Sequence, residues 1–152
     1  MAARTGEGRA ALVEAGYELI AELGYSGATT AKICQRAGVS SGTFFHFFPT
    51  KMDLLLGILE ADASHSRLRA DALNARASID PAGALSTWLD TLFAEASDPH
   101  LAGFVAGLSA APAHTPLEEC LSEIAALQHT TLVSIVAAGQ AGGIWRDDLV
   151  AD

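Results

Sequence analysis

Apolar residues recur with a helical period along nearly the whole chain of 152 residues. Between residues 7 and 23 they fall three or four positions apart, which is typical of one buried face of an α-helix. Glycine, serine and proline interrupt the period at short intervals and mark helix ends. We therefore expect an all-α fold, with helices at 7–23, 31–37, 41–48, 51–76, 82–96, 101–108 and 116–141.

The segment AGVSSGTFFHFFPTK, residues 37–51, holds four of the six phenylalanines in the chain. On a helix, Phe44, Phe47 and Phe48 share one face, which can bury against the two preceding helices. A strand is the alternative, since phenylalanine favours sheets. A lone strand in a helical chain would leave its backbone without hydrogen-bond partners, so we prefer the helix.

The residues around this segment favour a tight turn between two short helices. Gly38 can adopt positive φ, and Ser40 is a suitable N-cap for the helix that follows, just as Thr29 or Thr30 is for the helix before. Two short helices joined in this way are typical of a helix-turn-helix. We place it at about residues 29–48, inside a three-helix module that spans residues 1–50.

Small or outward-facing side chains remain on the outer side of the third helix. Ser41 and Thr43 can hydrogen-bond phosphates or base edges, and Gly42 permits close approach of the backbone to DNA. Backbone N–H groups at the start of the helix attract phosphate. Phe45 and His46 face outward and are left to meet the DNA, Phe45 by apolar contact such as that with a thymine methyl.

The net charge of −9 alone speaks against nucleic acid, but it is unevenly distributed. Residues 1–58 carry five basic and five acidic side chains, so the whole charge of −9 lies in residues 59–152. Contact with phosphate depends on the local face rather than on the total charge. Arg4 and Arg9 could form an arm that touches phosphate or could be an ordinary solvated terminus, and the residues leave both open.

The segment GATTAKICQRAGVSSGTFFHFFPTKMDLL resembles the DNA-binding module of the tetracycline-repressor (TetR) family, and the resemblance extends over about Arg9–Leu59. It implies a transcriptional regulator, usually a repressor, that binds a palindromic DNA operator as a homodimer. It also implies that residues 51–152 form a helical regulatory and dimerisation domain, joined to the DNA-binding module by the long helix. A small ligand bound to that domain would release the operator.

The same resemblance assigns positions to individual residues. Thr29 and Thr30 would lie at the start of the second helix, near the DNA backbone, and Lys51 would bind a phosphate. The recognition helix would open with Ser40, Ser41, Gly42 and Thr43. Two positions depart from the family pattern, which usually has a tyrosine where Phe45 stands and a histidine where Phe47 stands. His46 occupies the variable place between them, and the lost tyrosine hydroxyl costs about 1 kcal/mol.

Family members usually continue beyond the segment GQAGGIWRDDL into one more long helix, which completes a four-helix bundle between two copies. We expect this chain to lack that helix. Three alternatives follow: the chain is a fragment, it forms a homodimer through helix 116–141 alone, or it does not pair in the usual way. A monomer would present a single DNA-binding module and would lose most of the affinity for the operator.

Large apolar residues in the C-terminal part are candidates for a ligand cavity: Trp88, Leu92, Phe93, Phe104 and Leu108. The alternative is that they are ordinary core. The polar groups considered for orienting a ligand are few, namely His65, His100, His114, His129, Cys120 and Gln128. We therefore expect a mostly apolar or aromatic effector.

Several other classes of protein are not expected. No H-x₃-H pair indicates a metal, no cofactor motif is present, and no set of nucleophile, base and acid indicates an enzyme. No apolar run approaches the roughly 18 residues of a membrane span, so we expect a cytoplasmic protein without membrane contact. A second hypothesis is a helical binding or dimerisation protein of the same fold that no longer binds an operator.

Overall fold

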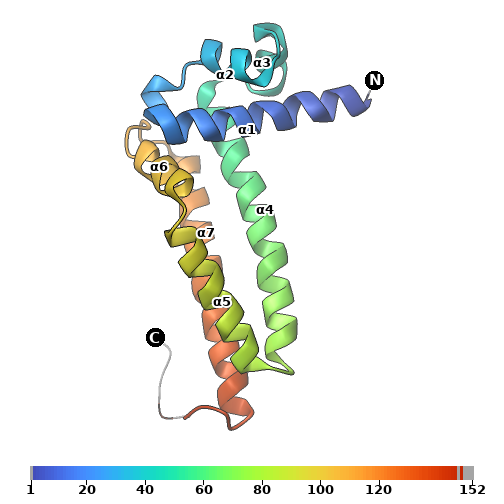
Figure 1. The fold of residues 1–152 in the computed structure, drawn as a ribbon, viewed down its shortest axis with the longest axis vertical. Helices are drawn as coiled ribbons and strands as arrows, with labels where there is room; N and C mark the ends of the chain where they lie inside the picture. The colour runs from blue at the N-terminus through green and yellow to red at the C-terminus, as the bar shows by residue number, and fades with distance from the viewer. Residues whose placement is uncertain (1, 147, 149–152) are drawn as a thin grey trace. The chain divides into compact units, whose positions relative to one another are not determined.

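The computed structural model describes residues 2–146 and 148, the first four of them as backbone only. Over these residues the chain forms seven α-helices joined by short turns and loops, with no strand, which confirms the all-α prediction (Figure 1). The helices are α1 (Ala2–Gly27), α2 (Thr30–Ala37), α3 (Ser41–Phe47), α4 (Lys51–Ala77), α5 (Pro81–Ala96), α6 (Pro99–Leu108) and α7 (Thr115–Ala141).

The ends of the helices lie close to the predicted ones, except at the start of the chain. α1 begins at Ala2 rather than at residue 7, since alanine and arginine at its start are good helix formers. Its helical geometry is interrupted at Gly24, which has φ 70° and ψ 168°. This is the position where the sequence predicted the helix to stop, and only glycine adopts such a conformation readily.

The chain divides into two compact units. Unit 1 comprises Met1–Ala61 and Ser97–Glu118, and unit 2 comprises Asp62–Ala96 and Glu119–Asp152. α6 therefore belongs to the same unit as α1, α2 and α3, although it follows them by many residues. α4 and α7 each contribute to both units. This division differs from the boundary at residues 50 and 51 expected from the sequence.

Unit 1 has a core of large apolar side chains. Those that are almost completely buried are Leu12, Ile20, Ile33, Phe44, Leu54 and Leu55. The predicted inner face of α1 is buried at Leu12, Ala15, Leu19 and Ile20, but Leu23 is 46% exposed. That part of the prediction is wrong, although Tyr25 and Ala28, which follow Gly24, are buried again.

α6 packs closely on α1 within unit 1 (Figure 1). A Cβ atom on Gly103 would lie 2.7 Å from the carbonyl oxygen of Ala21, and one on Gly107 would lie 2.7 Å from that of Ile20. The two backbones can therefore approach this closely only because both positions are glycine. Phe104, one residue after the first glycine, is buried, and its ring centroid lies 4.9 Å from that of Tyr17.

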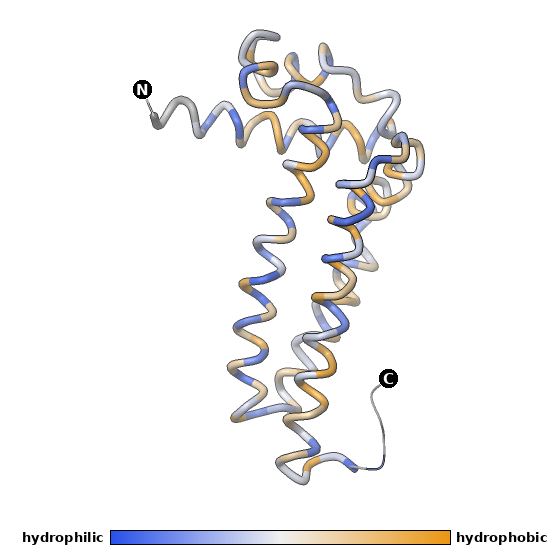
Figure 2. Tube along the Cα trace, turned by 180° about the vertical axis from the view of Figure 1, so that it is seen from behind, coloured by the Kyte–Doolittle hydropathy of each residue, from blue (hydrophilic) through white to orange (hydrophobic). Residues whose placement is uncertain are grey.

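Unit 2 has a smaller core made of Ala77, Ala84 and Ile135. The partly buried side chains packed against it are Leu73, Leu85, Trp88, Ala138 and Trp145. Phe93, which the sequence placed in a ligand cavity or in the core, is 67% exposed. Hydrophilic and hydrophobic residues are mixed along α4 (Figure 2).

α7 differs from the expectation that no segment is apolar enough to span a membrane. Among the described helices it alone is long and apolar enough to cross one, by length and composition only, and 11% of its most apolar window is buried. One such helix is weak evidence of a membrane protein, because the core helix of a soluble protein has the same composition.

Candidate nucleic-acid interface and ligand cavity

Local hydrogen bonds fix the turn between α2 and α3. Of the two threonines considered as N-cap of α2, Thr29 takes the role, and its hydroxyl oxygen accepts from the backbone N–H of Lys32 at 3.4 Å. Gly38 ends the helix with φ 66° and ψ 29°, and its N–H donates to the carbonyls of Cys34 and Gln35. The left-handed conformation at Gly38 turns the chain directly towards α3.

Ser40 caps α3 as predicted. Its hydroxyl oxygen accepts from the N–H of Thr43 at 3.1 Å, and the hydroxyls of Ser40 and Thr43 lie 2.9 Å apart. The side chains of Ser41, Phe45 and His46, together with Gly42, are exposed on the outer side of the helix, and Thr43 is half-buried. The structure thus brings together on α3 the residues that the sequence singled out for it.

The phenylalanines divide into buried and exposed members. Phe44 is completely buried and Phe48 nearly so, which fixes the inner face of α3. Phe45 is 55% exposed, and its ring stands edge-on against Phe44 with 5.2 Å between centroids. His46 is also exposed and lies against Phe47 at 5.0 Å. The buried rings therefore hold the helix while Phe45 and His46 face outward.

Two of the basic side chains near this surface make contacts inside unit 1. The Arg9 guanidinium lies 5.3 Å from the centroid of the Phe48 ring. The Lys32 ammonium donates to the carbonyl of Gly27 at 3.1 Å. The side chain of Arg4, the other residue of the expected arm, lies outside the described residues.

Lys51, the first residue of α4, is half-buried against the end of α1. Its ammonium donates to the carbonyl oxygen of Tyr25 at 2.6 Å and lies 4.0 Å from the centroid of the tyrosine ring. Burial lowers the pKa of Lys51 and raises that of Tyr25, where the nearby Asp53 carboxylate adds to the effect. Thr50 and Asp53 form a capping box at the start of α4: the N–H of Asp53 donates to the Thr50 hydroxyl at 3.1 Å, and the N–H of Thr50 donates to Asp53 Oδ2 at 2.8 Å.

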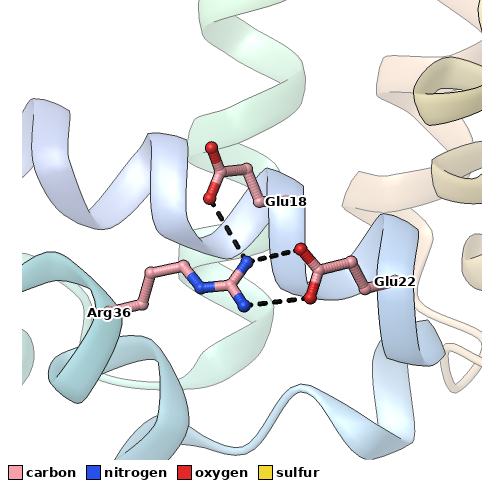
Figure 3. Close-up of polar contacts among 3 residues, drawn as sticks. All are labelled: Glu18, Glu22 and Arg36. Carbon is pink, nitrogen blue, oxygen red and sulfur yellow. Dashed lines mark hydrogen bonds and ion pairs between the residues drawn. The ribbon is translucent and has the colours of Figure 1, made fainter.

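Arg36, at the end of α2, forms a fork with two carboxylates of α1 (Figure 3). Its two terminal nitrogens donate to Glu22 at 2.6 and 2.9 Å, and one of them also contacts Glu18 at 3.3 Å. The hydrogen bond from Arg36 lowers the pKa of Glu22. The sequence analysis missed this cluster, although two glutamates four residues apart on one helical face were a usable signal.

A cavity of about 50 Å³ lies in unit 2, between α4, α5 and α7. Of the residues expected to bind ligand, Trp88 and Leu92 line it, as do Ala70, Leu73 and Leu127. Phe93 is exposed outside the lining, while Phe104 and Leu108 lie on α6 in unit 1. The structure therefore does not bring these five residues together.

The lining is more polar than the sequence suggested. Of the six polar residues considered as ligand-orienting groups only Gln128 reaches it, but Ser66, Arg69, Thr91, Glu95 and Thr131 do so as well. Arg69 forms an ion pair with Glu95 at 2.9 Å and donates to the Ser66 hydroxyl at 3.0 Å. These residues were missed because their meeting depends on how α4, α5 and α7 pack rather than on local spacing.

No metal centre emerges from the part of the chain that the structure describes. Within residues 2–146 and 148, no three histidine, cysteine, aspartate or glutamate side chains gather as a metal ion would require. The sites to be explained are therefore the outer face of α3 and the cavity in unit 2.

α2, α3 and the turn between them have the arrangement of a helix-turn-helix. The family described as bacterial regulatory proteins, tetR family, has a model that matches residues 12–58. The fatty acid metabolism regulator protein of Bacillus subtilis is 37% identical over 49 residues, which cover 32% of this chain and 25% of that protein. Residues 12–58 are therefore similar to the DNA-binding module of the tetR family. The matched family is one of regulatory proteins rather than enzymes.

Solved structures match over most of the chain. The TetR transcription regulatory protein from Mycobacterium vanbaalenii is 28% identical with a TM-score of 0.71, and the match covers 98% of this chain and 85% of that one. The regulator FadR from Bacillus subtilis, solved in complex with stearoyl-CoA, has a TM-score of 0.71 at 24% identity, with coverages of 93% and 75%. At that identity the second likeness shows the fold alone.

Proposed function

We infer that this protein is a TetR-like transcriptional regulator that binds a palindromic DNA operator through α3. As the family resemblance implies, it would act as a repressor that leaves the operator when a small, mostly apolar ligand binds the C-terminal domain. Such a regulator works in the cytoplasm, where its DNA lies.

The observation that carries this proposal is the exposed outer face of α3. Ser41, Gly42, Phe45 and His46 are exposed on it, and Thr43 is half-buried. Small side chains let a recognition helix enter the major groove closely, and the buried phenylalanines hold it firmly enough to keep one orientation.

The remaining candidates for DNA contact differ in the hydrogen bonds that their side chains already make within the protein. The side-chain oxygens of Thr29 and Ser40 serve as helix caps, so these residues would act chiefly by fixing the helices that meet the DNA. Thr30 is half-buried at the start of α2 and stays a candidate for a backbone contact. The Lys51 ammonium has three N–H donors, and one bond to Tyr25 leaves donors for a phosphate.

The cavity in unit 2 is the candidate ligand site, with Trp88 and Leu92 in its lining. Its volume of about 50 Å³ is far below the roughly 300–1,000 Å³ of sites that hold drug-sized ligands. Ligand binding would therefore have to open it, and opening would shift helices that line it. α4 contributes to both units. A shift of α4 would therefore alter the spacing of the two DNA-binding modules in a dimer and lower the affinity for the operator.

A homodimer is proposed through helix 116–141, much of whose apolar surface is unburied in one chain. Two copies would present two α3 helices to the two halves of a palindrome. Light scattering tests this step: a mass of twice 15.7 kDa is expected, and a monomer at the concentrations used for DNA binding would contradict it.

The experiment that tests the proposed function is selection of binding sites from random duplex DNA, followed by affinity measurements at several salt concentrations. We expect a two-fold symmetric site and an affinity for it that falls steeply with salt, because each phosphate contact releases a counterion. Failure to enrich any sequence would contradict operator binding.

One observation favours the second candidate, a helical binding or dimerisation protein that has lost operator binding. Among the described side chains of unit 1, all four lysines and arginines make intramolecular contacts: Arg9, Lys32, Arg36 and Lys51. A surface with few free cations neutralises few phosphates. The salt series separates the two candidates, since only the first requires a steep slope.

A further inference from the structure

We propose that Phe45 reads the C5 methyl group of a thymine, and that this contact is the main direct base readout made by α3. The inference rests on the proposed DNA binding through α3. It adds the chemical feature of the operator that the protein recognises.

The composition of the outer face of α3 limits what the helix can read. The five residues on it are Ser41, Gly42, Thr43, Phe45 and His46. None of them is an arginine or lysine, which read guanine, or an asparagine or glutamine, which read adenine. The serine and threonine hydroxyls can hydrogen-bond to more than one kind of base, so they discriminate weakly between bases.

Phe45 is the large side chain on this face, and its surroundings hold it in place. Its ring is 55% exposed, yet it stands edge-on at 76° against the ring of Phe44. Phe44 is itself completely buried and packs against Phe48 with 6.2 Å between centroids. A ring that already packs against Phe44 loses little conformational entropy when it binds. The favourable free energy of a small apolar contact is therefore not offset by the cost of ordering the side chain.

A phenylalanine ring has no hydrogen-bond donor or acceptor, so it cannot bind a phosphate or a polar base edge. The thymine methyl is the apolar group that a base pair presents in the major groove. Removing one such methyl from a buried contact corresponds to about a fourfold loss of affinity per half-site, from the usual free energy of burying one carbon. A symmetric operator with two contacts would lose roughly the square of that factor.

Deoxyuridine substitution tests the proposal. The operator is first obtained by selection with the full chain, and each thymine is then replaced singly, with its symmetry mate, by deoxyuridine. This change removes the methyl and keeps the hydrogen-bonding groups of the base. We expect one thymine position at which wild type loses about tenfold or more in affinity, and at which Phe45→Ala does not distinguish the two bases.

His46→Ala is the matched control, because it removes an exposed ring from the adjacent position of the same helix and should keep the discrimination. Phe45→Leu replaces Phe45→Ala if the alanine variant binds too weakly for comparison, and should discriminate less than wild type. Sequence-specific binding by wild type with no effect of deoxyuridine at any thymine would overturn the proposal, as would unchanged discrimination in Phe45→Ala. Absence of any selected sequence would instead overturn DNA binding itself.

Discussion

The ammonium of Lys51 lies 2.6 Å from the carbonyl oxygen of Tyr25 and 4.0 Å from the centroid of its ring. This contact ties the first turn of α4 to the segment that follows Gly24, where α1 loses its helical geometry. A carbonyl near an interrupted helix end needs a hydrogen-bond donor, and the lysine supplies one. Lys51 therefore has a structural role in unit 1 as well as a proposed role on DNA.

Substituting Lys51 separates these two roles. We expect Lys51→Ala to lower the free energy of unfolding by about 1–2 kcal/mol, because a half-buried charge-assisted hydrogen bond is lost. It should also weaken binding to all DNA sequences alike and reduce the salt slope by about 1 for each half-site. Lys51→Arg, which keeps the charge, is the control. A salt slope that is the same in wild type and Lys51→Ala would remove Lys51 from the DNA interface.

The close crossing of α6 and α1 predicts a large effect from one methyl group. In Gly107→Ala the new Cβ would lie 2.7 Å from the backbone carbonyl of Ile20, so the helices must separate. We expect a loss of about 1–3 kcal/mol in the free energy of unfolding, measured by chemical denaturation. Gly6→Ala is the control, since a Cβ on Gly6 meets nothing within 4 Å; it should be neutral or stabilising by up to about 1 kcal/mol. Equal stabilities of the two variants would contradict the packing of α6 on α1.

Trp145 gives an optical test of the end of α7. Its ring lies on Gly139, where a Cβ would come into severe contact with the indole. In a Trp88→Phe background, Gly139→Ala should displace the ring into water and shift its fluorescence emission to longer wavelength. The same substitution in a background without Trp145 should leave Trp88 emission nearly unchanged. Unaltered Trp145 emission would mean that the indole does not rest on Gly139.

The fork between Arg36 and the α1 glutamates predicts a pH-dependent stability. Arg36 lowers the folded-state pKa of Glu22 below its usual value of 4.5, so the stabilisation is present above that value. It is lost as the pH falls through the lower folded-state pKa, because the protonated carboxyl no longer pairs with the guanidinium. The melting temperature of Arg36→Gln should therefore lie below that of wild type near neutral pH, and the two should converge in acid.

The control for the fork is the pair of variants Glu22→Gln and Glu22→Gln/Arg36→Gln. If Arg36 acts through Glu22 and Glu18, adding Arg36→Gln to Glu22→Gln should cost less than it costs in wild type. A difference between wild type and Arg36→Gln that stays constant from neutral to acidic pH would show that the ion pair does not carry the effect.

Local rules were enough to predict the ends of most helices. Gly38 and Ser40 act through hydrogen bonds to residues a few positions away, and Gly24 acts through its own backbone conformation, so their roles can be read from short stretches of sequence. The inner face of α3 was predictable for the same reason, since Phe44 and Phe48 follow a helical period.

Contacts between distant segments were not predictable in this way. Nothing near Gly103 or Gly107 indicates that α6 packs on α1, and so Phe104 was assigned to a cavity in the C-terminal part although it lies in unit 1. Phe93 was expected in the ligand cavity or in the core but is largely exposed. The ion pair of Arg69 with Glu95 joins two helices and has no local signature.

The most direct test of operator recognition is the affinity of wild type and of Phe45→Ala/His46→Ala for the selected DNA site and for a scrambled site of equal length. A regulator that reads DNA through α3 is expected to prefer its site by at least about a thousandfold, and the double variant should lose most of that preference while keeping its fold and its binding to scrambled DNA. Equal affinity of wild type for both DNAs would contradict operator recognition, and an undiminished preference in the double variant would place the reading surface somewhere other than on α3.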